Sequence, residues 1–377
     1  MTEEWSLDVM NRIDPACRHL GDVYGVESED GFSWHTVLVA EGYVLHFRDD
    51  VLIDSLTYEG DIDYIKFSAN HRYLLGYSGT DNTMKLFDLI ESTVVYQLVF
   101  SHDMGLLSEP SFRLADDGRI IAKYSTYLRI YDSDLNVILS SDDFEWGGNY
   151  IGMTHDGSRM YSSDDRYLRS FDANAYERWS VDLPESEGVT AWRRFTLSNA
   201  GRYLAITDLS KLYLYDAITG RKISEYDFET GLLEPVFSPN DAYIVISTSN
   251  YPDDWTPQRN EDGFGMVLVS CTGGIVEQIS EFYLLRSNST FPYLFTKNCV
   301  SDSGIALGYL NYSARFTRVA LLSDRSVCLW LSGNAAKYSA PPNRAWFLEY
   351  QQGISPDGSR LWFFDGQLLH FCIAEGV

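Results

Sequence analysis

Residues 67–78 read FSANHRYLLGYS, which is an apolar strand ending in serine, a polar turn and a second apolar strand. The phrase returns as LADDGRIIAKYS, MTHDGSRMYSS, LSNAGRYLAIT, FSPNDAYIVIS, VSDSGIALGYL and ISPDGSRLWFF, after a weaker copy, ESEDGFSWHTVLVA. Its anchor residues are Ser28, Ser68, Ala115, Thr154, Ser198, Ser238, Ser301 and Ser355, at intervals of 39 to 63 residues. A repeat near forty residues that is built of short strands predicts radially arranged blades.

Each well-formed repeat contains four short strands. In the second repeat they are expected at 64–68, 72–78, 84–88 and 93–99, with Gly, Asn, Asp or Ser in every gap. A meander of four strands cannot bury both faces alone, so neighbouring repeats must stack. We therefore predict an all-β fold, a single closed β-propeller domain over residues 1–377 with four-stranded antiparallel blades. Eight blades are preferred and seven are the alternative.

A family resemblance appears in the third strands. Residues 78–88, SGTDNTMKLFD, resemble the turn and third strand of a WD repeat. Three further repeats end that strand in an aromatic-Asp pair, namely Tyr131-Asp132, Phe171-Asp172 and Tyr215-Asp216. Phe or Tyr stands where the family usually has Trp, and the customary Gly-His before each blade is missing. The resemblance implies a WD-repeat-like β-propeller scaffold, in which the loops between second and third strands and those between blades open on one face.

The last repeat, residues 351–377, shows only three strands. The resemblance leads us to expect that the N-terminal segment, 1–19, supplies the closing strand of that blade. Trp5, Leu7 and Val9 alternate as a strand requires. Trp5, Val9 and Ile13 also share one helical face, with Thr2 as its cap, so both readings stay open at this point.

Net charge and length limit the classes of partner. The formal net charge is −25, and only 7 of the 29 basic residues are Lys. A field of that sign repels nucleic acid and anionic membranes, so neither is expected as a partner. The balance of charges fits either adaptation to salt or a basic partner. The chain has no run of eighteen apolar residues, and MTEEWSLDVM does not resemble a signal peptide, so we expect a cytoplasmic protein.

Motifs for chemistry are not found. The five cysteines form no CxxC or CxxH pair, which favours buried, reduced thiols over a metal site or a disulfide framework. No GxSxG, GxxxxGK, GxGxxG or HExxH string occurs, and the seven His are scattered. Residues 216–220, DAITG, are read as a tight turn in which Gly220 has a positive φ. We therefore predict no catalytic residue, no cofactor and no metal, and a protein that is not an enzyme.

Loop-borne aromatic residues suggest where a partner binds. The loop insertion at 249–263 combines aromatic and acidic residues, and other Trp residues fall in or beside predicted loops. The predicted partner-binding residues are Trp255, Tyr251, Asp253, Asp254, Trp146, Trp192 and Trp346. The predicted function is a non-enzymatic scaffold for protein–protein interaction. The alternatives are a propeller enzyme or small-ligand binder with its site at the central channel, or a structural component of a larger assembly.

Overall fold

The computed structural model describes most of the chain in short segments separated by gaps. They are residues 2–8, 17–28, 31–40, 42–60, 62, 64–79, 82–99, 111–124, 127–141, 150–163, 166–184, 193–208, 210–228, 231–249, 265–272, 274–279, 299–304, 306–312, 315–321, 327–331, 352–355, 357–364 and 368–373. These segments hold strands and turns and no helix, so none of them offers a helix able to span a bilayer. Their strands form eight four-stranded antiparallel sheets, one for each predicted repeat.

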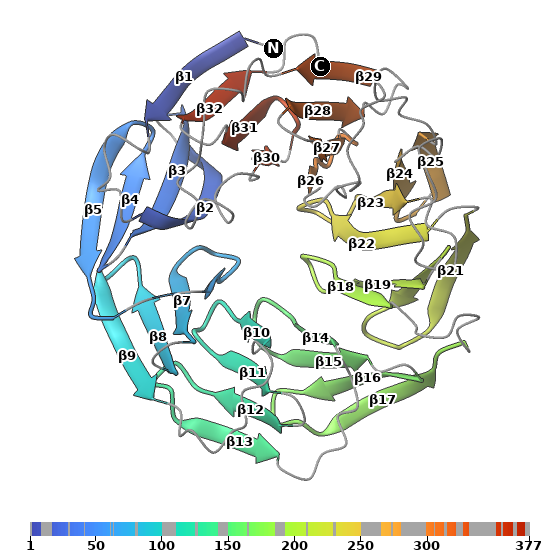
Figure 1. Ribbon diagram of the computed structural model, residues 1–377. Coiled ribbons are helices and arrows are strands. Elements are labelled where there is room, and N and C mark those ends of the chain that lie inside the picture. Colours follow the sequence, from blue (N-terminus) through green and yellow to red (C-terminus); the bar gives the residue numbers. More distant parts are fainter. Residues whose placement is uncertain are drawn as a thin grey trace. The chain divides into compact units, whose positions relative to one another are not determined.

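The chain divides into two compact units, each described by itself (Figure 1). Unit 2 comprises Met10–Glu185 and the turn Ala217–Gly220. It contains sheet 1 with β2 (Cys17–Ser28), β3 (Gly31–Ala40), β4 (Tyr43–Arg48) and β5 (Val51–Thr57), and sheet 2 with β6 (Tyr64–Phe67), β7 (Tyr73–Ser78), β8 (Thr83–Asp88) and β9 (Thr93–Val99). It also contains sheet 3 with β10 (Ser111–Leu114), β11 (Ile120–Tyr124), β12 (Tyr127–Tyr131) and β13 (Val137–Ser141), and sheet 4 with β14 (Tyr150–Met153), β15 (Arg159–Ser163), β16 (Tyr167–Asp172) and β17 (Glu177–Asp182).

Unit 1 comprises Met1–Val9, Ser186–Asp216 and Arg221–Val377. Sheet 5 has β18 (Arg194–Leu197), β19 (Tyr203–Asp208), β20 (Lys211–Asp216) and β21 (Lys222–Asp227), and sheet 6 has β22 (Gly231–Phe237), β23 (Tyr243–Ser249), β24 (Gly265–Ser270) and β25 (Gly274–Ile279). Sheet 7 has β26 (Cys299–Val300), β27 (Ala306–Tyr312), β28 (Arg315–Leu321) and β29 (Val327–Leu331). Sheet 8 joins β30 (Gln352–Ile354), β31 (Arg360–Phe364) and β32 (Leu368–Ile373) to β1 (Thr2–Asp8).

The first strand of the chain therefore completes a sheet made by its last residues. In β1, Trp5 is paired with Phe371 and Leu7 with Leu369, in an antiparallel ladder with β32. Of the two readings of this segment, a strand and a helix, the strand is the one observed. The assignment of residues 1–377 to one domain stays a prediction.

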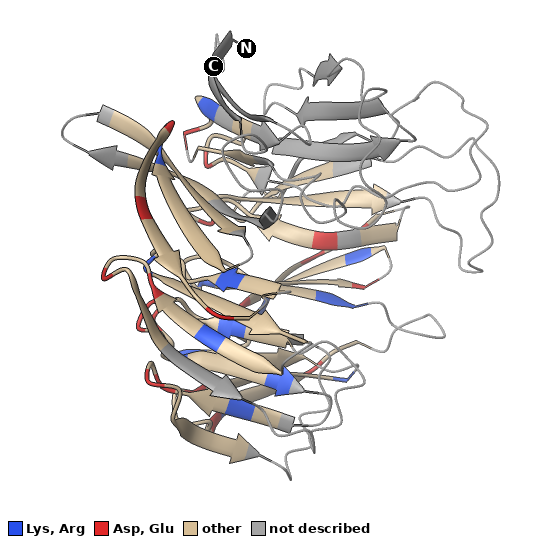
Figure 2. Ribbon diagram, turned by 60° about the vertical axis from the view of Figure 1, so that its left-hand side comes forward, with Lys and Arg blue, Asp and Glu red and all other residues tan. Residues whose placement is uncertain are grey.

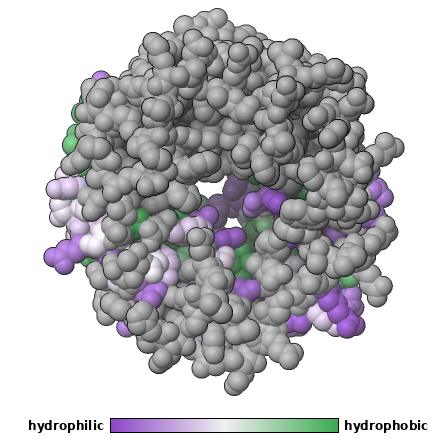
Figure 3. Space-filling model, in the orientation of Figure 1, coloured by the Kyte–Doolittle hydropathy of each residue, from purple (hydrophilic) through white to green (hydrophobic). Residues whose placement is uncertain are grey.

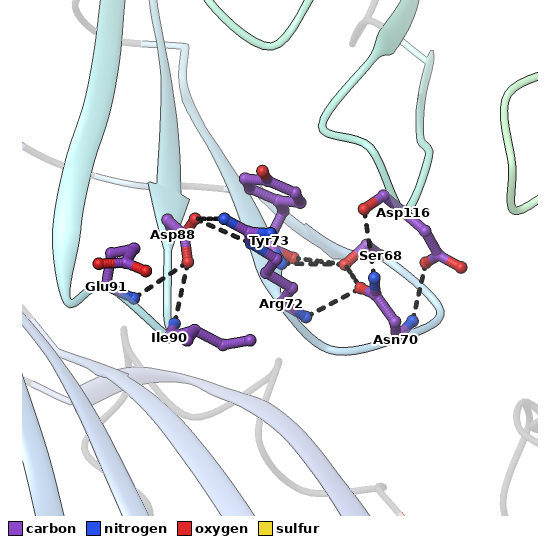
Figure 4. A network of polar contacts seen from close by, with 8 residues as sticks. All are labelled: Ser68, Asn70, Arg72, Tyr73, Asp88, Ile90, Glu91 and Asp116. Atoms are coloured by element: carbon purple, nitrogen blue, oxygen red, sulfur yellow. Dashed lines mark hydrogen bonds and ion pairs between the residues drawn. The ribbon is translucent and has the colours of Figure 1, made fainter.

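The hydroxyl of the repeated phrase closes the turn between the first and second strands of its sheet. Ser68 Oγ accepts a hydrogen bond from the Tyr73 backbone N–H at 2.9 Å and donates one to Asn70 Oδ1 at 2.7 Å (Figure 4). A backbone N–H five residues later is bound in the same way, at 2.9 to 3.1 Å, by the hydroxyls of Thr154, Ser198, Ser238 and Ser355. A short hydroxyl side chain that binds nearby backbone favours a tight turn over a continued strand. In five of the eight copies the repeated phrase thus forms a turn that is closed by a side-chain hydroxyl, whereas the copy at Ala115 has no hydroxyl.

Polar residues of these turns also bind the turn of the following sheet. In unit 2, Asn70 donates to Asp116 from its backbone N–H at 2.8 Å and from Nδ2 to the Asp116 carbonyl at 3.2 Å (Figure 4). In unit 1, the Asn240 backbone N–H donates to Asp302 Oδ1 at 2.8 Å. The polar residues of the repeated phrase therefore form hydrogen bonds between consecutive sheets at one end.

The apolar core lies between consecutive sheets. Buried residues of sheets 1 and 2, such as Val37 and Phe87, form one cluster, and further clusters join sheets 2 and 3 and sheets 3 and 4. In unit 1 the same arrangement joins sheets 5 and 6 and sheets 6 and 7. Second and third strands are the most deeply buried, and all six residues of both β7 and β8 are buried. Stacking of sheets thus buries the faces that a single meander leaves exposed.

The fourth strand of sheets 1 to 6 carries a β-bulge at one recurring position. In sheet 1, Phe47 is paired with Leu52 and His46 with Asp54, so Ile53 is the extra residue. In each of the other five sheets the pairing of the third and fourth strands skips one residue at the corresponding place. These extra residues are Val95, Ile138, Arg178, Ile223 and Val276. A bulge leaves its extra residue out of the ladder and increases the local twist of an edge strand.

Candidate functional site

The predicted partner-binding residues lie outside the residues that the structure describes. This holds for all seven, namely Trp255, Tyr251, Asp253, Asp254, Trp146, Trp192 and Trp346. The structure neither places them together nor separates them, and they stay a prediction. The candidate site is therefore built from what the described residues expose.

The Asp residues of the aromatic-Asp pairs close the hairpin between third and fourth strands. Asp88 Oδ1 accepts the backbone N–H groups of Ile90 and Glu91 at 3.0 and 3.1 Å, and Oδ2 is paired with Arg72 Nη2 at 2.7 Å (Figure 4). Burial by itself raises the pKa of Asp88, but the bonds from Arg72, Glu91 and Ile90 outweigh it and hold the pKa below its usual value. In sheet 2, Arg72 thus binds Asp88, in a repeat that lacks the Gly-His pair usual in WD repeats.

The exposed apolar residues gather at these same hairpins. Ten of the eleven exposed large hydrophobic side chains among the described residues lie in the hairpin or in the first three residues of a fourth strand, the exception being Tyr43 at the start of β4. The ten are Val51, Leu52, Ile53, Ile90, Val94, Val137, Ile138, Tyr176, Ile218 and Ile223. Single exposed apolar residues are ordinary, but a cluster marks an interaction site.

The densest group lies on sheets 1 and 2 of unit 2, and we call it the β5–β9 surface. Its five apolar residues and their exposed fractions are Val51 58%, Leu52 50%, Ile53 48%, Ile90 71% and Val94 39%. The bulge at Ile53 accounts for three consecutive exposed aliphatic residues, because it interrupts the alternation between the two faces of β5. Figure 3 shows apolar atoms along the edge where β5 lies.

One hydrogen bond brings the two sheets together at this surface. The Ser92 hydroxyl, in the β8–β9 hairpin, donates to Asp54 Oδ2 on β5. Ile53 precedes the acceptor in sequence, and Ile90 lies two residues before the donor. The apolar residues of β5 and those of the hairpin therefore belong to one continuous surface.

Acidic residues surround the apolar ones. Asp50 and Glu91 are exposed, Asp54 is half-buried, and the nearest Arg in sequence is Arg48. Figure 2 shows the same trend through the described residues, with Asp and Glu on many turns and Lys and Arg mainly on strands. Acids around an apolar centre steer a basic partner to the surface, and the apolar residues supply buried area.

The backbone of β5 adds a second means of binding. It is the outermost strand of sheet 1, in the order β2-β3-β4-β5, and no strand among the described residues is paired with its outer side. An edge strand of this kind accepts an extended segment of another chain through main-chain hydrogen bonds. The β5–β9 surface thus combines apolar area, acidic charge and an open sheet edge.

A cluster of one tyrosine and three histidines lies in sheet 1 and the first turn of sheet 2. His35 Nδ1 is 2.9 Å from His46 Nε2, which is 3.4 Å from the Tyr24 hydroxyl. The His71 ring stacks on the Tyr24 ring with centroids 3.7 Å apart and an angle of 3° between planes. Burial, then the charge of Arg48, lowers the pKa of His35. Burial, then His35, lowers the pKa of His46 to about 4.

Metal and thiol chemistry find little support in the described part of the chain. It holds no group of three or more His, Cys, Asp or Glu side chains arranged to bind a metal ion. Cys271 is a buried free thiol, as predicted, and burial raises its pKa to about 12, so it stays protonated and unreactive. Gly220 has φ 73°, which confirms the tight turn predicted at 216–220.

Neither the β5–β9 surface nor the histidine cluster was predicted from the sequence. The signal for the surface was the triplet Val51-Leu52-Ile53, which breaks the alternation of a half-buried strand. The signal for the cluster was the spacing of His35 and His46 around a short hairpin, which makes them diagonal neighbours once β3 and β4 pair.

Comparison with known proteins identifies the fold. The sequence matches no protein-family model and no curated protein. Among solved structures, Kluyveromyces lactis Hsv2 is similar over 84% of this chain and 98% of its own, with 10% identity and a TM-score of 0.54. Its form with loop 6CD replaced by a Gly-Ser linker gives the same coverage and identity with a TM-score of 0.55. Hsv2 of Kluyveromyces marxianus covers 79% of this chain and 93% of its own, with 8% identity and a TM-score of 0.50.

These similarities confirm the predicted fold class. The solved structures are WD-repeat β-propellers, and the described strands form the repeated four-stranded antiparallel sheets of that architecture. The chain therefore has a WD-repeat-like β-propeller fold. At 8 to 10% identity the likeness carries the fold alone, and function has to be argued from the surface of this chain.

Proposed function

We propose that this protein is a non-enzymatic β-propeller scaffold that binds another protein, and that the β5–β9 surface is one of its binding sites. The observation that carries the proposal is the cluster of five exposed aliphatic side chains within an acidic surround on an open edge strand. The partner that fits is an extended segment with apolar and basic side chains. Its backbone pairs with β5, its apolar residues cover Leu52 and Ile90, and its basic residues face Asp50 and Glu91.

A second binding region is proposed on the loops. Trp255, Tyr251, Asp253 and Asp254 combine the same two properties, aromatic area and acidic charge, within the insertion at 249–263. Further loop tryptophans proposed to contact the partner are Trp146, Trp192 and Trp346. Substitution Trp255→Ala is expected to lower partner affinity by about 2 kcal/mol, the usual scale of an interface hot spot.

The test compares one substitution at the surface with a matched one away from it. A partner captured from the native host is identified, and its affinity is measured against Leu52→Ser, Ile90→Ser and Tyr43→Ser. Tyr43 has an exposed fraction of 49%, close to the 50% of Leu52, but lies at the other end of sheet 1. Leu52→Ser and Ile90→Ser should each weaken binding at least tenfold without loss of thermal stability, and Tyr43→Ser should leave affinity unchanged.

The outcomes separate the two regions. If Trp255→Ala abolishes binding while both surface variants bind normally, the loops carry the interaction and the β5–β9 surface does not. If no variant at either region alters the affinity of a stoichiometric partner, the proposal fails for both.

A further inference from the structure

The histidine cluster connects sheet 1 to both turns of sheet 2 at the end where the β5–β9 surface lies. Tyr24 and His35 are direct cross-strand partners on β2 and β3, and His46 on β4 is opposite Asp54 on β5. His71, in the turn between β6 and β7, stacks on Tyr24. Asp54 accepts the Ser92 hydroxyl from the β8–β9 hairpin. One row of side chains across sheet 1 therefore holds two separate turns of sheet 2.

The hydrogen bond between the two imidazoles requires one unprotonated ring nitrogen. When His46 Nε2 is that nitrogen, it accepts from His35 Nδ1–H at 2.9 Å and shares the same lone pair with the Tyr24 hydroxyl at 3.4 Å. One added proton can be shared between the two ring nitrogens, and the Tyr24 hydroxyl must then accept from His46 instead of donating to it. A second proton leaves two N–H groups facing each other at 2.9 Å and two positive charges in contact.

The charged groups around the pair act in opposite directions. Arg48 and His71 disfavour a positive charge on His35, while Asp49 favours it. His35 disfavours a positive charge on His46, while Asp54 favours it. A cation on His46 therefore attracts the Asp54 carboxylate, which is the acceptor for Ser92. Protonation of the pair thus changes the contacts of the two residues that hold sheet 2, namely Tyr24, on which His71 stacks, and Asp54, which accepts from Ser92.

We propose that Tyr24, His35, His46 and His71 form an acid-sensitive clasp, which holds the two turns of sheet 2 against sheet 1 when neutral and releases them when the histidine pair is protonated. Because the β8–β9 hairpin carries Ile90 and Glu91, opening of the clasp alters the β5–β9 surface. This last step rests on the proposed function, whereas the clasp itself does not.

The sign of the pH dependence follows from linkage. A histidine whose folded-state pKa is below the unfolded value of 6.5 adds stability above pH 6.5, and this stability is lost as the pH falls toward the folded pKa of about 4. Between pH 7.5 and 5.0, His46 alone is expected to raise the unfolding equilibrium constant about thirtyfold. If solvent screening halves the shift, the rise is about tenfold.

The experiment measures chemical unfolding at pH 7.5 and 5.0 for the wild type, His46→Gln and His155→Gln. His155 is the matched control, because it lies in the turn between β14 and β15 of sheet 4 and binds Asp116 through its backbone carbonyl, which the substitution keeps. Between pH 7.5 and 5.0 the unfolding equilibrium constant of His155→Gln should rise as much as that of the wild type. The rise for His46→Gln should be at least tenfold smaller. Hydrogen exchange corrected for intrinsic rates should rise at pH 5.0 in residues 69–72 and 89–92 of the wild type.

A second measurement needs no variant and no partner. Imidazole signals of the wild type, followed by NMR from pH 8.0 to 5.0, should include one histidine of the seven that stays neutral down to pH 5.0. Seven histidines that all titrate near 6.5, or an equal pH response in His46→Gln and the wild type, would overturn the clasp. Partner binding that is equal at pH 7.5 and at pH 4.0, where His46 is about half protonated, would overturn only the link between the clasp and the β5–β9 surface, provided that the clasp itself is confirmed.

Discussion

The substitution Ser198→Ala tests whether the repeated phrase works through its hydroxyl. Ser198 is 1% exposed, and its Oγ donates to Asp241 Oδ2 at 2.7 Å. The same oxygen accepts the backbone N–H groups of Arg202 at 3.1 Å and Tyr203 at 3.0 Å. A hydrogen bond to a charged group contributes about 1.5–3 kcal/mol, and the shared pair of neutral bonds about 1 kcal/mol. We expect Ser198→Ala to lower the free energy of unfolding by about 3 kcal/mol.

The conservative control is Ser198→Thr, because Thr154 occupies the equivalent position of sheet 4, accepts the equivalent backbone N–H and also donates to a carboxylate, that of Asp156 in its own turn. We expect it to cost less than about 1 kcal/mol, since the hydroxyl is kept. The assay is unfolding in urea, followed by tryptophan fluorescence and by hydrogen exchange of β19. A cost below about 1 kcal/mol for Ser198→Ala would refute the reasoning. Equal losses in the two variants would show that side-chain volume, not the hydroxyl, matters.

A double-mutant cycle isolates the bond itself. Asp241 is 4% exposed and also accepts the Ala200 backbone N–H. If Ser198 and Asp241 stabilise unit 1 through one shared hydrogen bond, the double variant Ser198→Ala/Asp241→Asn should lose less stability than the sum of the single variants. Strict additivity would mean that the two side chains act independently.

Three further expectations concern strain, salt and acid. Gly220→Ala should cost about 2–3 kcal/mol in urea unfolding, because Gly220 has φ 73° and an added Cβ meets the Trp179 ring at 2.8 Å. Gly42→Ala, with φ 79° but its nearest atom at 3.6 Å, should cost about 1 kcal/mol, and equal costs would rule out the contact with Trp179. The melting temperature should rise from low to molar salt, because screening reduces the repulsion within a chain of net charge −25, and an unchanged value would contradict this. The wild type should lose stability as the pH falls below the usual carboxyl pKa, because Asp88 has a lowered pKa in the folded state and stabilises the fold while it is ionised. Asp88→Asn should lose less stability over the same pH range, and thermal melts at several pH values check this.

The parts of the fold that local sequence determines were predictable. Ser68 reaches a backbone N–H only five residues away, and Asp88 binds N–H groups two and three residues away. Such contacts depend on short stretches of chain, so the turns and hairpins could be read from composition and spacing. The four-stranded repeats and the propeller class followed from their recurrence.

The candidate site depends on contacts that spacing does not reveal. Whether His35 meets His46 is set by the register of β3 against β4, and whether Ile53 is exposed is set by a bulge against β4. A shift of one residue in either ladder would turn these side chains to the opposite face. Register and bulges are properties of paired strands, and a single sequence shows each strand alone.

The recurring bulge also bears on how such a chain diversifies. Its extra residue is aliphatic in five sheets and is Arg178 in sheet 4, yet the bulge occurs at the same position of the fourth strand in all six sheets. Because that residue takes no part in the ladder, mutation can replace it without shifting its neighbours. Where the extra residue is exposed, as it is at Ile53, Ile138, Arg178 and Ile223, the sheet offers a position at which surface chemistry can change while the backbone stays constant. Consecutive sheets of one chain can in this way present different side chains to different partners.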